Sequence, residues 1–218
     1  MILITGPKIL PRGGNQQLGD AVATYPLTHS QEGVWVGYLA DRSSTQYNHT
    51  LGWSLNTSTE PQPGLQEIAA GKGHTETLDQ LAAIHELNKG HSILRSTIIS
   101  LQGKPHIQEH DPNTATPIIR LLTILDGIKS EQQLHQALHE SFDLENAFPV
   151  RWYVVQRSWG KQVFLVSHHI ALDDGALTRL SREFLECLDG GIHVSIKGSE
   201  EFSQAHSVEK EKELTHVI

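Results

Sequence analysis

The feature that most constrains the fold is an apolar run that ends in two histidines. The sequence Val163-Phe164-Leu165-Val166 is apolar at every position, without the alternation of a half-exposed strand. This pattern is typical of a strand that is buried on both faces. The chain must therefore place other elements on both sides of this strand, which requires a layered fold.

His168 and His169 emerge close to the end of this predicted strand. Because successive strand side chains point to opposite faces, at most one of the two imidazoles can line a given cavity. Asp173, Asp174 and Gly175 follow where a turn meets a helix, and either aspartate can cap that helix through its free amides. An isolated polar residue at such a place usually has only a structural role.

Helical and strand patterns mix irregularly along the rest of the chain. Val34, Trp35, Tyr38 and Leu39 recur at helical spacing after Thr28, a suitable N-cap, which predicts a helix with one aromatic face up to about Ala40. Strict β–α–β alternation is absent, which indicates an α/β or α+β fold with a mixed β-sheet flanked by helices. The other patterns predict helices at 77–88, from 130 and at 175–188, and strands at 50–55, 93–101, 105–108, 118–124, 150–156 and 162–167.

Composition argues against several kinds of partner. The 17 Lys and Arg against 25 Asp and Glu give a net charge of −8, so charge does not attract nucleic acid or an anionic membrane. Cys187 is the single cysteine, which excludes an internal disulfide and a cysteine-based zinc site and fits the cytoplasm. No segment approaches the length of a membrane span.

The 14 histidines invite a metal hypothesis. His135 and His139 are four residues apart, as are His106 and His110, but neither pair has a third ligand nearby in the sequence. The first pair also lacks the glutamate of a zincin helix. We therefore expect no metal site. A serine hydrolase is not supported either, because no Gly-x-Ser-x-Gly segment is present.

Residues 168–173 resemble the His-His-x-x-x-Asp-Gly signature of the condensation domains of nonribosomal peptide synthetases. The same signature occurs in their chloramphenicol-acetyltransferase-like, coenzyme-A-dependent acyltransferase relatives. Three further segments are similar to motifs of the family and follow in the family's order: 26–35, 90–97 and 142–144. The resemblance covers about residues 25–205.

The resemblance implies an N-terminal lobe of a two-lobed condensation domain with a chloramphenicol-acetyltransferase-like fold. Residues 1–24 would form a strand or loop, 25–205 the lobe, and 206–218 a polar linker toward an absent C-terminal lobe. In this family the active site lies in a tunnel between the lobes. Two carrier domains enter the tunnel with phosphopantetheine thioesters, so the chain itself needs no bound cofactor.

The resemblance also assigns residues. His169 is implied to be catalytic and His168 to support it, while Asp173 is implied to pair with an arginine, for which Arg95 is the natural candidate. The family has glycine where this chain has Asp174, which leaves open whether Asp173 or Asp174 is the structural aspartate. The candidate tunnel-lining or substrate-lining residues are Gly175, Ser30 and Gln31.

The implied reaction is amide-bond formation between a donor acyl thioester and the amine of a carrier-bound acceptor amino acid. The implied partners are acyl and peptidyl carrier domains, the missing C-terminal lobe and an adenylation domain of the parent chain. Two alternatives remain at this point: an acyltransferase that uses a coenzyme A thioester, and a non-catalytic lobe that only docks carriers. Since half of the tunnel is missing, we expect these 218 residues alone to be inactive.

Overall fold

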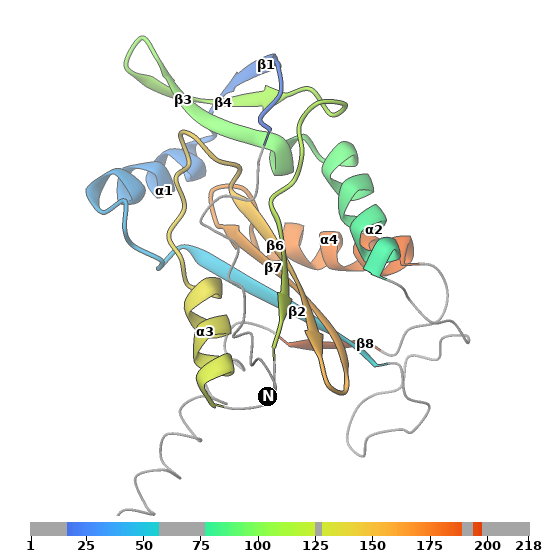
Figure 1. The fold of residues 1–218 in the computed structure, drawn as a ribbon. Helices are drawn as coiled ribbons and strands as arrows, with labels where there is room; N and C mark the ends of the chain where they lie inside the picture. Colours follow the sequence, from blue (N-terminus) through green and yellow to red (C-terminus); the bar gives the residue numbers. More distant parts are fainter. Residues whose placement is uncertain (1–16, 57–76, 125–127, 189–193, 198–218) are drawn as a thin grey trace, which may run out of the picture.

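A computed structural model describes residues 17–56, 77–124, 128–188 and 194–197, which form two β-sheets and four α-helices (Figure 1). The smaller sheet is antiparallel, in the order β1-β4-β3. The larger sheet has the order β5-β6-β7-β2-β8, with β5 parallel to β6 and every other pair antiparallel. The strands are β1 (Ala21–Pro26), β2 (Asn48–Asn56), β3 (Ser96–Leu101), β4 (Lys104–His110), β5 (Ile119–Thr123), β6 (Val150–Arg157), β7 (Gly160–His168) and β8 (Val194–Lys197).

Helices cover both faces of the larger sheet, α1 and α3 to its left and α2 and α4 to its right in Figure 1. The helices are α1 (His29–Ala40), α2 (Thr77–Gly90), α3 (Ile128–Leu138) and α4 (Asp174–Cys187), with a short 3-10 helix, η1 (Ser92–Arg95), after α2. The predicted mixed sheet flanked by helices is confirmed.

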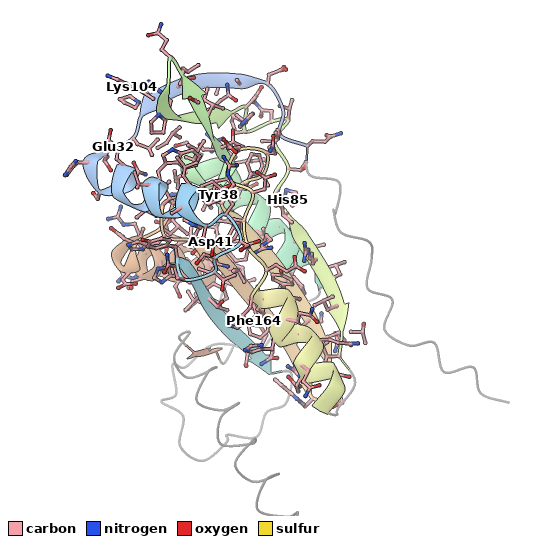
Figure 2. The ribbon with its side chains drawn as sticks, turned by 90° about the vertical axis from the view of Figure 1, so that its left-hand side faces the viewer. Glu32, Tyr38, Asp41, His85, Lys104 and Phe164 are labelled. Carbon is pink, nitrogen blue, oxygen red and sulfur yellow. The ribbon has the colours of Figure 1, made fainter. Side chains whose placement is uncertain are left out.

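Strand β7 lies between two hydrophobic layers, as the apolar run predicts. Val163 and Leu165 face α2 and α4, whereas Phe164 and Val166 face α1 and α3. All four side chains are completely buried. Tyr38 of α1 and Phe164 belong to the second layer, and both are labelled in Figure 2. The strand therefore carries its last residues to the edge of a core that is packed on both sides.

One predicted strand starts later than expected, and one strand is additional to those predicted. Residues 93–95 are not a strand but part of η1, because the Arg95 side chain donates to the carbonyl oxygens of Asn88 and Lys89 and holds the chain tightly at the end of α2. Of the apolar residues at helical spacing in α1, Trp35 and Tyr38 are buried, whereas 47% of Leu39 is exposed. Strand β8 was not predicted from the sequence.

The described residues also bear on the segments at the two ends. Strand β1 pairs with β4 and spans residues 24 and 25, between which we expected the N-terminal segment to end and the lobe to begin. Residues 1–16 and the expected linker at 206–218 lie outside the described residues.

Candidate active site

Strand β7 ends at His168, and the side chains of His168 and the following His169 turn to opposite sides of the sheet. The pairing sets Asn48 of β2 opposite His168, while the backbone N–H of His169 donates to the carbonyl oxygen of Tyr47 at 2.8 Å. His168 belongs to the aromatic layer beside α1, and His169 turns toward the α4 side. The two imidazoles therefore occupy different environments, as the alternation of strand side chains requires.

His168 is a buried, neutral imidazole. It is 2% exposed, and the rings of Tyr38 and Phe142 contact it edge-on, with centroids 6.2 and 6.0 Å away. Its Nδ1 accepts a hydrogen bond from the backbone N–H of Ile170 at 3.2 Å. Burial, with smaller contributions from the two nearby imidazoles, lowers the pKa of His168 to about 4. This arrangement fits a structural role in closing the turn after β7.

His169 is only partly buried, and its ring packs against that of His49. The two ring centroids are 4.9 Å apart, with 35° between the planes. The Nδ1 atom of His169 is buried and has no hydrogen-bond partner among the described residues. Because His169 is partly exposed while His168 is enclosed, His169 is the member of the pair that a substrate can reach.

His49, which no sequence pattern singled out, lies beside His169 and the start of α4. It lies on β2 directly opposite Ser167, and its Nδ1 is 3.8 Å from Oδ1 of Asp174. Burial and then His169 lower the pKa of His49, while the Asp174 carboxylate opposes this shift. Only the register between β2 and β7 brings His49 to the site, and no local pattern around residue 49 signals it.

The expected ion pair between Asp173 and Arg95 is wrong for this chain. Asp173 is the N-cap of α4, and its Oδ1 accepts a hydrogen bond from the backbone N–H of Ala176 at 2.7 Å. Arg95 is 5% exposed and pairs instead with Glu109, at 2.7 Å. The Arg95 guanidinium is also held in this place because it donates hydrogen bonds to the carbonyl oxygens of Asn88 and Lys89, which lack intrahelical partners at the end of α2.

At the start of α4, the backbone does not require a glycine at residue 174 or 175. Neither Asp174 nor Gly175 has a positive φ, and a Cβ at residue 175 would meet nothing closer than Asp173 Oδ1 at 3.5 Å. Asp174 is the first residue of the helix, a position that favours a carboxylate. Asp173 is therefore the residue that caps α4, while the Asp174 carboxylate is exposed and faces His49.

Gln31 supports the histidine turn from α1. Its Nε2 donates to the carbonyl oxygen of Ile170 at 2.9 Å, and its Oε1 accepts from the backbone N–H of Thr28 at 3.0 Å. The Thr28 hydroxyl accepts from the backbone N–H of Gln31 in return, which completes a capping box. Gln31 thus ties α1 to the turn, whereas Ser30 is exposed on the first turn of α1.

No cluster of three or more His, Cys, Asp or Glu side chains in the described ranges could hold a metal ion. Within the same part of the chain, no helix has the length and apolar character needed to cross a membrane.

Known proteins resemble this chain in sequence and in fold. No family model matches it. It is 31% identical over 225 residues to the hybrid PKS-NRPS synthetase TAS1 of Gloeophyllum trabeum, a match that covers 100% of this chain and 13% of that synthetase. The chain thus spans about an eighth of the length of this curated relative.

Solved structures give the same result for the fold. The first condensation domain of the CDA synthetase matches with a TM-score of 0.60 and 13% identity, over 77% of this chain and 40% of that one. The X-domain from teicoplanin biosynthesis matches with a TM-score of 0.58 and 21% identity, over 78% of this chain and 34% of that one.

Proposed function

Because the chain belongs to the condensation-domain family of nonribosomal peptide synthetases, we propose that it supplies the histidine-bearing half of an amide-forming active site. The observation that carries this proposal is the asymmetry of the two histidines. His168 is buried in an aromatic layer, whereas His169, at the end of the same strand, is partly exposed beside the start of α4. A second lobe would complete the site over His169.

In the proposed reaction, the amine of a carrier-bound acceptor amino acid attacks the carbonyl carbon of a donor acyl thioester. A C–N bond forms, the C–S bond breaks, and the sulfur leaves as a thiol. His169 accepts a proton from the attacking amine, or holds the amine and stabilises the tetrahedral intermediate. The proton lost by nitrogen is available to the departing sulfur, so the reaction needs no other reactant.

The proposed partners follow from this chemistry. Acyl and peptidyl carrier domains present both substrates on phosphopantetheine arms, and an adenylation domain of the same synthetase loads the acceptor. A coenzyme A thioester is the other donor that this chemistry accepts. The activity would be that of an acyltransferase or amide synthase.

The decisive experiment is His169→Ala in the two-lobed condensation domain that contains this chain. We expect the rate of amide formation from carrier-bound thioesters, measured by mass spectrometry of the product, to fall by a factor of about 10²–10⁴, as for loss of a general base. His139→Ala is the matched control, because His139 is an exposed imidazole on the turn after α3. Unchanged amide formation by His169→Ala would favour a non-catalytic docking lobe.

A further inference from the structure

We propose that His49 is a positioning residue that holds the imidazole of His169 by packing against it from β2. This inference rests on the catalytic role proposed for His169. The carbonyl oxygen of Tyr47, just before β2, accepts the backbone hydrogen bond of His169, and His49 follows two residues later on β2. The segment that leads into β2 thus contacts the backbone of His169, and β2 itself contacts the ring, whose centroid is 4.9 Å from that of His49.

The need for such a contact comes from the second ring nitrogen of His169. A hydrogen bond to this nitrogen commonly fixes the tautomer and orientation of a functional histidine. Here Nδ1 of His169 is buried and has no such partner in the part of the chain that is described. Packing against a neighbouring ring is then what restricts rotation of the His169 imidazole.

Asp174 connects this contact to the start of α4. Its Oδ1 lies 3.8 Å from Nδ1 of His49, and 92% of its side chain is exposed, against 28% for His49. An exposed pair of this kind is weak, so Asp174 biases the orientation and protonation of His49 without fixing them. Asp174 stands where the family signature has glycine, so His49 and Asp174 form a pair that the signature does not provide.

The contact is tested first by proton titration of the imidazoles in this chain, followed by NMR. The charged and titratable groups that face His49 in the described residues are His169, after β7, and Asp174, on α4. Since His169 lowers the pKa of His49 and Asp174 raises it, His169→Ala should raise that pKa and Asp174→Asn should lower it. If neither substitution moves the titration of His49, the proposed contact is absent and the inference is overturned.

The functional test compares three variants in the two-lobed domain, with carrier-bound thioesters as substrates. His49→Ala removes the packing ring, and we expect kcat to fall about 10- to 100-fold with little change in KM, the result of a misplaced catalytic group. His49→Phe keeps a ring at this place and should recover most of the lost kcat. His139→Ala, in the stacked pair of His135 and His139 beyond the site, should behave as wild type.

The outcomes separate this inference from the proposed function. Loss of activity in His169→Ala, together with a wild-type kcat in His49→Ala, would overturn the positioning role and leave the catalytic role of His169 intact. Full activity in His169→Ala would overturn the proposed function, and the positioning role with it. Equal losses in His49→Ala and His49→Phe would also contradict ring packing as the mechanism.

Discussion

At the scale of single residues, two adjacent histidines differ because a strand turns neighbouring side chains to opposite sides. His168 contacts Tyr38 and Phe142 and is neutral, while His169 packs against His49 at the partly exposed edge. The sequence predicts this separation, since it follows from strand geometry alone. It does not predict His49, because the partner of a strand residue depends on the register between strands.

The buried His168 should make the stability of the chain depend on pH. The unfolded chain protonates His168 below about pH 6.5, whereas the folded chain resists protonation until about pH 4. The contribution of the neutral imidazole is therefore fully present above about pH 6.5 and is lost as the pH falls toward 4. At pH 4 this loss amounts to about 3 kcal/mol of the free energy of unfolding.

Urea unfolding between pH 4.5 and 7.5 checks this prediction with His168→Phe. This variant cannot titrate at residue 168, so its free energy of unfolding should fall less steeply with acidification. It should lose about 1 kcal/mol at pH 7.5, because the backbone N–H of Ile170 loses its acceptor. His139→Ala serves as the control with an exposed imidazole, and a pH slope shared by all three proteins would contradict the assignment.

At the scale of elements, α4 links the site to the core. Its first turn is capped by Asp173, and further along Phe184 packs against both Trp53 and Trp152, with centroid distances of 4.6 and 5.4 Å. The sequence predicts this helix and its apolar stripe from their period. It leaves both aspartates open as caps, and only the hydrogen bond to Ala176 decides for Asp173.

Substitutions at Asp173 distinguish a helix cap from an ion pair. We expect Asp173→Ala to reduce the free energy of unfolding by about 1 kcal/mol, while Asp173→Asn stays within a few tenths, because asparagine caps helices equally well. Chemical denaturation measures both variants. A loss in Asp173→Asn as large as that in Asp173→Ala would show that the charge matters, as it would in an ion pair with an arginine.

The packing of α4 on the sheet is tested by Phe184→Ala. Phe184 is completely buried, so truncation should leave a cavity and cost about 3–5 kcal/mol. Leu39→Ala is the control, since Leu39 is 47% exposed and should change stability by less than about 0.5 kcal/mol. The two thermal unfolding midpoints give the comparison, and similar midpoints would contradict the described core.

At the scale of the whole molecule, the described residues form a layered lobe with the fold of condensation domains, matched over about 40% of the CDA synthetase domain. The family's motifs predict this fold from the sequence, although the identity to that domain is only 13%. The motifs predict less well which polar side chains form ion pairs and hydrogen bonds with one another. Arg95 takes Glu109 in place of Asp173, because its own neighbours along the chain offer it closer acceptors.

The lobe alone should not form amide bonds. In the proposed site, His169 is partly exposed, and a second lobe is needed to exclude water and to guide both carrier arms. We expect product only when this chain is joined to a C-terminal lobe and supplied with loaded carriers. Mass spectrometry of the reaction detects the amide, and multiple turnovers by the 218-residue chain alone would refute the two-lobe requirement.

The sequence by itself determined the layered fold and the buried strand that ends in two histidines, because apolar periodicity and short motifs are local properties of the chain. The tertiary structure decided which residues surround those histidines. His49, Gln31 and Asp174 reach the turn from three different elements. Their placement depends on strand register and helix packing, which arise from contacts between distant segments and leave no local signature.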